Sequence, residues 1–259
     1  MSLLTASSIV TTLRAAGCVF AEDEADLLIS AARDEAELAA MVEQRVSGLP
    51  IEHVVGWAEF HGLRITVDPG VFVPRRRTSF LVDEAISLSR PGSVVVDLCC
   101  GSGALGVAVA SAQEVELYAA DIEPAAVRCA RRNVEPLGGQ VFEGDLFDPL
   151  PPSLRGRVDI LLSNVPYVPT DDVRLLPAEA RLHEPRITLD GGSDGLDVLR
   201  RVSAAAPGWL APGGHVLVET SERQASVAAD IFERDGIAAR VAASEEPYAT
   251  AVIGTKPCR

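Results

Sequence analysis

The regular alternation of apolar runs with amphipathic segments after residue 90 limits this chain to a small number of folds. Val94–Val96 and Val158–Leu162 are short, mostly apolar runs, which is typical of strands buried on both faces of a sheet. Segments with helical spacing lie between such runs, and one of them, Pro124–Asn133, has a proline in its first turn. Buried strands that alternate with helices form a mostly parallel, doubly wound sheet. We therefore predict an α/β fold for residues 77–259.

The same pattern assigns the segments of this region one by one. The predicted strands are Val94–Val96, Glu116–Ala120, Gln140–Phe142, Val158–Leu162, Gly214–Glu219, Ile237–Val241 and Ala249–Ile253. The predicted helices are Thr78–Ser89, Ala104–Ser111, Pro124–Asn133, Asp194–Ala206 and Ser221–Arg234. Such a set fits one large domain with a smaller unit beside it.

The first 50 residues have a helical pattern instead. Ile9, Leu13 and Leu28 belong to a series of apolar side chains at helical spacing, with Asp and Glu on the other face. Gly48-Leu49-Pro50 ends the series. We expect residues 1–50 to form a small helical domain.

Residues 51–76 change to a strand pattern. Phe60–Val67 alternates as a strand does, Asp68-Pro69-Gly70 is a turn signal, and Val71–Val73 returns as a second short strand. The sequence predicts a β-hairpin that links the helical domain to the main domain.

Charge and cysteine content exclude several classes of function. The formal net charge is −14, which disfavours binding to DNA, although Arg75-Arg76-Arg77 forms a local basic segment. The 5 cysteines include no CxxC pair, so we expect no metal site, and their odd number is typical of reduced thiols in the cytoplasm. No apolar run approaches the roughly 20 residues that cross a bilayer, so we expect no membrane segment. The sequence does not indicate an oligomeric state.

A glycine-rich loop joins the first strand of the main domain to its helix. Gly101-Ser102-Gly103-Ala104-Leu105-Gly106 is a full GxGxxG, and Asp121 ends the next strand. A carboxylate in that position accepts two hydrogen bonds from a ribose diol. Both dinucleotides and S-adenosylmethionine have such a diol, so the loop alone leaves the two cofactors open.

Two acidic residues favour S-adenosylmethionine over a dinucleotide. Asp97 ends the first strand, where a carboxylate would repel a pyrophosphate but suit the positively charged amino-acid end of S-adenosylmethionine, directly or through water. Asp145 follows the third strand, where it can accept a hydrogen bond from an adenine amino group.

The segment Ser163-Asn164-Val165-Pro166-Tyr167 follows the apolar run Val158–Leu162. The Asn164 side-chain oxygen and the Val165 carbonyl are two acceptors beside the flat ring of Tyr167, and Pro166 stiffens the turn. A planar NH₂ group, such as an amide or an exocyclic amine, satisfies both acceptors at once. The alternative is an ordinary turn with a capping asparagine.

Together these segments resemble the HemK/PrmC family of protein-glutamine N5-methyltransferases. The resemblance runs from Pro50 to the C-terminus. Its motifs are Asp97–Ala104, Ala120–Pro124, Gly144–Phe147, Ser163–Pro169, His183–Arg186 and Leu189–Leu196.

The resemblance implies a seven-stranded Rossmann-like class I methyltransferase sheet with a small N-terminal helical domain that binds substrate. It implies S-adenosylmethionine as cofactor and, as partner, a protein substrate such as a peptide-chain release factor, methylated on the Gln of its Gly-Gly-Gln loop. The catalytic residues that the resemblance implies are Asn164, Val165, Pro166 and Tyr167. The implied cofactor-binding residues are Asp97, Gly101, Gly103, Asp121, Ile122, Asp145, Leu146 and Asn164, and the implied substrate-binding residues are Arg75, Glu184 and Pro185.

Three departures from the family leave the substrate open. Val165 replaces a proline, the Arg75–Arg77 segment replaces a more acidic run, and the helical part is shorter than usual. Two alternatives therefore remain: an amino-group methyltransferase acting on nucleic acid or a small molecule, and a cofactor-binding module without catalysis.

Overall fold

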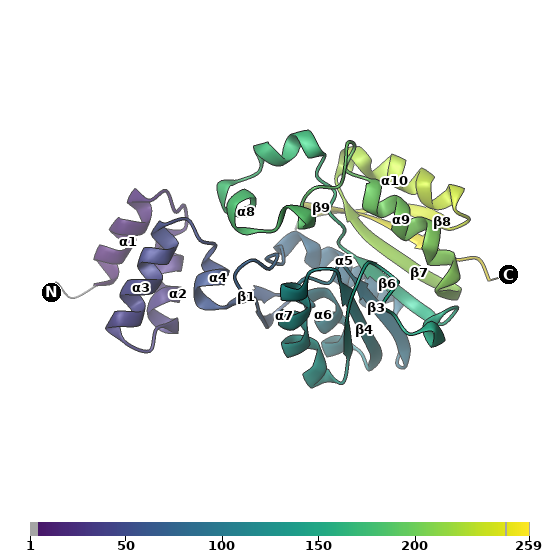
Figure 1. Ribbon diagram of the computed structural model, residues 1–259, viewed down its shortest axis with the longest axis horizontal. Coiled ribbons are helices and arrows are strands. Elements are labelled where there is room, and N and C mark those ends of the chain that lie inside the picture. The colour runs from purple at the N-terminus through teal and green to yellow at the C-terminus, as the bar shows by residue number, and fades with distance from the viewer. Residues whose placement is uncertain (1–4, 247, 259) are drawn as a thin grey trace.

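A seven-stranded sheet forms the centre of the chain in the computed structural model, which describes residues 5–246 and 248–258 (Figure 1). The strand order is β5-β4-β3-β6-β7-β9-β8. The bounds are β3 Ser93–Leu98, β4 Val115–Asp121, β5 Gln140–Glu143, β6 Val158–Ser163, β7 Leu210–Thr220, β8 Ala238–Glu245 and β9 Tyr248–Thr255. The strands from β5 to β7 pair in parallel, whereas β9 runs antiparallel to both β7 and β8. The predicted doubly wound α/β sheet is thus confirmed.

Helices cover both faces of this sheet, as its apolar strands require. On one face α5, α6 and α7 bury side chains such as Val82, Ala108 and Val127 against the sheet. On the other face α9 and α10 bury Val202 and Ala228. The bounds of these helices are α5 Ser79–Leu88, α6 Ala104–Ala112, α7 Pro124–Val134, α9 Asp197–Ala205 and α10 Glu222–Arg234.

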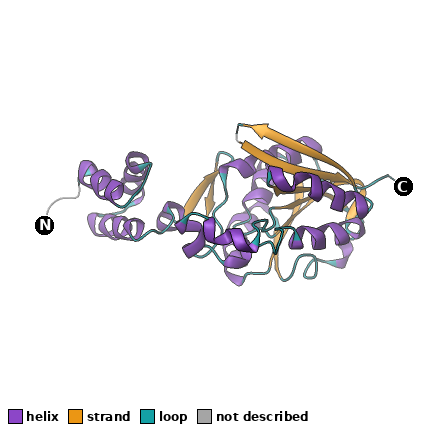
Figure 2. Ribbon diagram, turned by 90° about the horizontal axis from the view of Figure 1, so that it is seen from above, coloured by secondary structure: helices purple, strands orange, loops and turns teal. Residues whose placement is uncertain are grey.

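The N-terminal helices form a separate layer with a core of its own (Figure 2). Ile9, Leu13 and Leu28 are fully buried in that core, which explains the spacing of apolar residues in this part of the sequence. The helices are α1 Ala6–Ala15, α2 Ala21–Ala31, α3 Glu35–Val46 and the short α4 Ile51–Val55.

The linking hairpin is present, but its predicted strands were wrong. The observed strands are β1 Trp57–Phe60 and β2 Leu63–Thr66, joined at His61-Gly62. Both turn residues have positive φ, 52° and 73°, as a two-residue hairpin turn requires. The segment 71–73 is not a strand; its two valines are buried against the main core instead.

The segment between β6 and α9 contains one further short helix, α8 Ala178–His183, which the sequence pattern did not predict. Figure 1 shows α8 above the carboxyl ends of the parallel strands, on the side that faces the N-terminal helices. Within residues 5–246 and 248–258, no helix has the length and apolar character needed to cross a lipid bilayer.

Candidate active site

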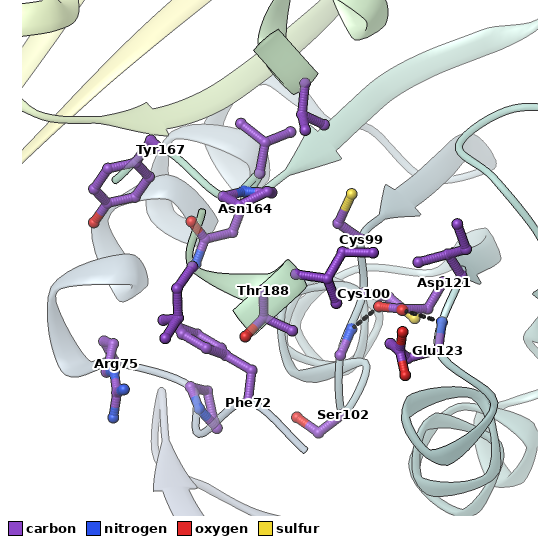
Figure 3. A pocket seen from close by; sticks show the side chains of 18 of the residues that line it. Phe72, Arg75, Cys99, Cys100, Ser102, Asp121, Glu123, Asn164, Tyr167 and Thr188 are labelled. Carbon is purple, nitrogen blue, oxygen red and sulfur yellow. Dashed lines mark hydrogen bonds between the residues drawn. The ribbon is translucent and has the colours of Figure 1, made fainter. Parts of the chain in front are cut away.

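A cavity of about 510 Å³ opens at the carboxyl ends of β3, β4 and β6 (Figure 3). This edge of an open parallel sheet is where ligands bind in doubly wound folds, and the volume is that of a small-molecule site. The cavity brings together most of the predicted site residues. These are Arg75, Gly101, Asp121, Ile122, Asp145, Leu146, Asn164, Val165, Pro166 and Tyr167.

The glycine loop wraps around the carboxylate of Asp121. The N–H of Gly101 donates to Oδ2 at 2.8 Å, and the N–H of Glu123 donates to Oδ1 at 2.9 Å. These bonds fix the carboxylate at the cavity wall, and each oxygen keeps a further acceptor position. Burial raises the pKa of Asp121, while the two N–H donors work against that rise. A carboxylate held in this way can accept from a ribose diol.

Asp97 lies behind the loop and does not line the cavity. Its side chain is buried, and its Oδ2 accepts the N–H of Gly106 at 2.9 Å in the first turn of α6. Burial raises the pKa of Asp97 to about 7. Because this carboxyl group lies at the start of the helix and takes the Gly106 N–H, a pyrophosphate would meet an acceptor there and would lack one of the donors that hold it. This arrangement suits S-adenosylmethionine better than a dinucleotide. Of the two predicted routes from Asp97 to the amino-acid end of the cofactor, the position of Asp97 behind the loop leaves the one through water.

The remaining glycine of the predicted cofactor set, Gly103, also lies outside the cavity lining. It caps α6 with φ of 77°, and a Cβ there would lie 2.8 Å from the Val134 side chain of α7. Gly103 thus allows the loop and two helices to pack closely. Cys99 of the same loop lines the cavity and has φ of 55°, a left-handed conformation that is unusual for a side chain other than glycine.

The other end of the cavity has a flat apolar wall with an acid beside it. Ile122 is 46% exposed and lines the cavity, and Leu146 lines it from the loop after β5. Asp145 also lines the cavity, and its Oδ2 accepts from Arg201 of α9 at 2.6 Å. This wall offers apolar contacts and one acidic acceptor to an adenine ring, and Arg201 holds the acid in place.

Asn164 and Val165 begin the loop that follows β6. No described residue donates to the Asn164 side chain or to the Val165 carbonyl, and both residues line the cavity. Val165 itself is buried, so its side chain anchors the turn where the related motif has proline. The two predicted acceptors therefore remain open to a ligand.

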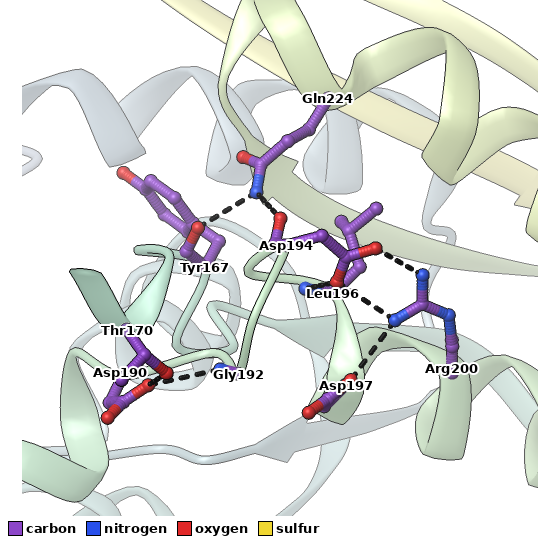
Figure 4. Close-up of polar contacts among 9 residues, drawn as sticks. All are labelled: Tyr167, Thr170, Asp190, Gly192, Asp194, Leu196, Asp197, Arg200 and Gln224. Atoms are coloured by element: carbon purple, nitrogen blue, oxygen red, sulfur yellow. Dashed lines mark hydrogen bonds and ion pairs between the residues drawn. The ribbon is translucent and has the colours of Figure 1, made fainter. Parts of the chain in front are cut away.

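The segment 189–195 holds this loop from behind (Figure 4). Gln224 of α10 donates from Nε2 to the Tyr167 carbonyl at 2.9 Å and to the Asp194 carbonyl at 2.8 Å. Gly191 and Gly195 pack so closely that a Cβ would lie 2.5 Å from the Pro166 oxygen or 2.2 Å from the Tyr167 oxygen. This explains why the glycine-rich segment accompanies the Asn-Val-Pro-Tyr motif in the sequence.

Tyr167 is also held by its hydroxyl group. The hydroxyl donates to Oε1 of Glu219 at 2.8 Å and accepts from Nη2 of Arg77 at 2.8 Å. Burial, followed by the Glu219 charge, raises the pKa of Tyr167 to about 12, so the phenol stays protonated.

Arg75 makes a comparable pair on the neighbouring wall. Its Nη2 donates to Glu184, whose Oε1 also accepts the Val73 N–H at 3.2 Å. Glu184 is buried and, like Pro185, does not line the cavity. The structure thus makes Glu184 the internal partner of Arg75 instead of a group that faces a substrate.

Two residues of this site, Arg77 and Glu219, were absent from the predicted set. Glu219 nearly ends β7, and its neighbour Val218 is in register with Ser163, the residue before Asn164. Because carboxyl ends of neighbouring parallel strands meet at one edge of the sheet, the sequence could have predicted that Glu219 lies near Asn164. The pairing with Arg77, 142 residues away, was not.

Comparisons with known proteins are consistent with this geometry. The family model "Methyltransferase small domain" matches residues 62–193. The release factor glutamine methyltransferase of Geobacter sulfurreducens is 40% identical over 206 residues, which cover 77% of this chain and 72% of the relative. A 4-amino-L-phenylalanine/4-methylamino-L-phenylalanine methyltransferase of Streptomyces pristinaespiralis is 35% identical over 75% of this chain and 69% of its own length.

A crystal structure of a methyltransferase from Pyrococcus furiosus has the same fold. It superposes with a TM-score of 0.58 at 17% identity, over 76% of this chain and 90% of that structure. At this identity the likeness concerns the fold alone.

Proposed function

Because this chain belongs to the release factor glutamine methyltransferase family, we propose that it methylates the side-chain amide nitrogen of a glutamine in a peptide-chain release factor. The family membership confirms the resemblance found in the motifs, and the chain is a methyltransferase that uses S-adenosylmethionine. The acceptor and the roles of individual residues are the proposal. A release factor substrate also implies a cytoplasmic location.

The observation that carries the proposal is the pair of open acceptors at Asn164 and Val165. An amide NH₂ has two N–H groups in one plane, and the Asn164 side-chain oxygen and the Val165 carbonyl can accept one each. The Tyr167 ring lines the same part of the cavity and offers a flat face to the planar amide. This arrangement selects an NH₂ group and fixes its plane.

S-adenosylmethionine, when bound, supplies an electrophilic methyl group on a sulfonium. The residues that would hold this cofactor all line the cavity, which supports that role: Gly101, Asp121, Ile122, Asp145 and Leu146.

The acceptor residues help a weak nucleophile in two ways. They hold the amide nitrogen in one orientation, which can contribute several kcal/mol of the barrier, up to about 7–11 kcal/mol in favourable cases. They also stabilise the positive charge that builds on nitrogen as its new bond to carbon forms and the carbon–sulfur bond breaks. One N–H proton is then lost to solvent.

A small amino-bearing substrate is the second candidate, and one relative supports it. The Streptomyces pristinaespiralis protein is named for action on aromatic amines, at an identity close to that of several release factor enzymes. Nucleic acid is less well supported, because Arg75 and Arg77 are each paired with a buried glutamate. The basic segment therefore does not present three free guanidinium groups to phosphates.

The division of the chain remains part of the proposal: a helical substrate-binding domain at 1–50, a linking hairpin at 51–76 and the methyltransferase domain at 77–259. The separate core of the helices supports a helical domain, and that domain extends beyond residue 50, because Ile51, Val54 and Val55 of α4 pack against the same core. Arg45 of α3 donates from Nη1 to Glu179 of α8 at 2.7 Å, and Glu179 lines the cavity. This contact gives the helical domain a direct connection to the site.

The substitution Asn164→Ala tests the proposed acceptor. We expect at least a hundredfold loss of methyl transfer, with S-adenosylmethionine affinity within about threefold of the unchanged protein by calorimetry, because the lost oxygen acts on the amide. Asn164→Asp, which keeps an acceptor oxygen, serves as the matched variant and should retain more activity. Full activity of Asn164→Ala would refute the assignment.

A further inference from the structure

An ion pair between Arg77 and Glu219 holds the hydroxyl end of the Tyr167 ring; the half-exposed Arg77 lines the cavity, whereas the buried Glu219 does not. Glu219 has a side chain only 4% exposed, and its Oε1 accepts from Nε of Arg77 at 3.1 Å as well as from the Tyr167 hydroxyl. Its Oε2 is buried without a hydrogen-bond partner among the described residues. Since a buried carboxylate is costly unless it is paired, Arg77 is the group that allows a charged glutamate here.

The three groups can form only one pattern of hydrogen bonds. Arg77 has donors only, the Glu219 carboxylate has acceptors only, and the phenol between them must therefore accept from the one and donate to the other. Each bond points along a fixed direction, so the hydroxyl end of the ring has a single position. The Tyr167 carbonyl is held independently by Gln224 (Figure 4). Tyr167 is thus held both at its hydroxyl group and at its backbone.

The position of the pair connects it to the acceptors. Glu219 follows Val218, the register partner of Ser163, and Asn164 is the next residue after Ser163. Arg77 and Tyr167 both line the cavity. A displacement of the Tyr167 ring would therefore change the cavity wall that faces the acceptor NH₂, three residues along the chain from Asn164.

We propose that Arg77 and Glu219 are positioning residues that hold the Tyr167 ring against the acceptor amide. The inference rests on the proposed function, since it concerns the same acceptor. It gives one residue of the arginine-rich segment a positioning role: Arg77 neutralises Glu219 and orients Tyr167. Arg77 and Glu219 act through Tyr167 and touch no reacting atom.

The test is a double-mutant cycle in methyl transfer with Tyr167→Phe and Glu219→Gln. Tyr167→Phe removes the hydroxyl, and Glu219→Gln replaces the charged acceptor by a neutral amide oxygen, so each single variant loses the charge-assisted bond; we expect roughly a tenfold fall in kcat in each, with unchanged S-adenosylmethionine affinity. Because both remove the same bond, the double variant should also fall about tenfold, whereas independent effects would give about a hundredfold. A hundredfold fall, or unchanged kcat in the single variants, would overturn the proposal.

Two further variants separate positioning from simple stability. Arg77→Met should lower kcat at least as much as Glu219→Gln, and Arg77→Lys should recover part of it, because a lysine can still pair with the glutamate. Arg76→Met is the matched control, since Arg76 has no ion pair with any described residue, and its kcat should be unchanged. Equal losses in Arg76→Met and Arg77→Met would contradict the assignment.

A spectroscopic measurement keeps this test independent of the acceptor. The chain has 3 tyrosines, so ¹⁹F NMR of protein labelled with 3-fluorotyrosine gives resolvable signals, and the Tyr167→Phe variant assigns the one of interest. Glu219→Gln and Arg77→Met should shift that signal, and Arg76→Met should not. If the signal shifts but the wild-type protein methylates no release factor, the positioning of Tyr167 by Arg77 and Glu219 is supported and the proposed acceptor is wrong. If the wild-type protein methylates a release factor and the signal does not shift, the positioning role alone is wrong.

Discussion

Replacing Asp97 by asparagine should change how the stability of this protein depends on pH. The Asp97 side chain is fully buried under the glycine loop, and that burial raises its pKa from 3.8 to about 7. The unfolded chain loses this proton near pH 4, whereas the folded chain keeps it until about pH 7. Between these values the folded state binds more protons than the unfolded state. The contribution of Asp97 to the free energy of unfolding therefore falls as pH rises, and this fall is complete above pH 7.

The size of the effect follows from the shift. A change of roughly 3 pKa units corresponds to about 4 kcal/mol at most. Asparagine has the shape of the protonated carboxyl group and keeps an oxygen for the Gly106 N–H, but it does not titrate. The free energy of unfolding of Asp97→Asn, minus that of the unchanged protein, should therefore increase by up to about 4 kcal/mol from pH 4.5 to pH 8.

Urea denaturation followed by circular dichroism at several pH values measures this difference. Asp159→Asn serves as the control, because Asp159 on the neighbouring strand also accepts a backbone N–H, from Val94, but is partly exposed and pairs with Arg90. A difference for Asp97→Asn that stays constant across the range would refute the reasoning about this carboxyl group.

Two further predictions concern the cofactor end of the cavity. Asp121→Asn should weaken S-adenosylmethionine binding roughly tenfold to a hundredfold, since the amide keeps one acceptor oxygen of two; unchanged affinity by calorimetry would remove Asp121 from the ribose site. Cys99→Gly should unfold with a free energy about 1 kcal/mol higher than Cys99→Ala, because only glycine adopts the observed φ of 55° without cost, and equal urea midpoints would contradict that strain.

The sequence was sufficient for the sheet, because continuous apolar strands such as Val94–Val96 have few alternatives to burial on both faces. It was also sufficient to bring Asp121 and Asn164 to one cavity, since both residues follow from the rule that strand ends meet at one edge. The hairpin was misplaced because the alternation of Phe60–Val67 continues through His61-Gly62, where the chain turns.

What the sequence could not give is contacts between distant side chains. Glu184 was expected to hold substrate, but its partners are Arg75 and the Val73 N–H, more than 100 residues away. The helix α8 has six residues between irregular segments, too few for its helical period to stand out. The Arg77–Glu219 pair likewise depends on how β7 and the start of α5 meet in the fold.

The central claim is that the open acceptors at Asn164 and Val165 hold the amide of a release factor glutamine. The most direct measurement is mass spectrometry of a purified release factor after incubation with this protein and isotopically labelled S-adenosylmethionine. We expect one labelled methyl group on the side-chain nitrogen of the glutamine in the Gly-Gly-Gln loop, and labelling at least a hundredfold slower with Asn164→Ala. Label on another residue, or a release factor that stays unlabelled while a small amine or RNA incubated in parallel becomes labelled, would contradict this assignment.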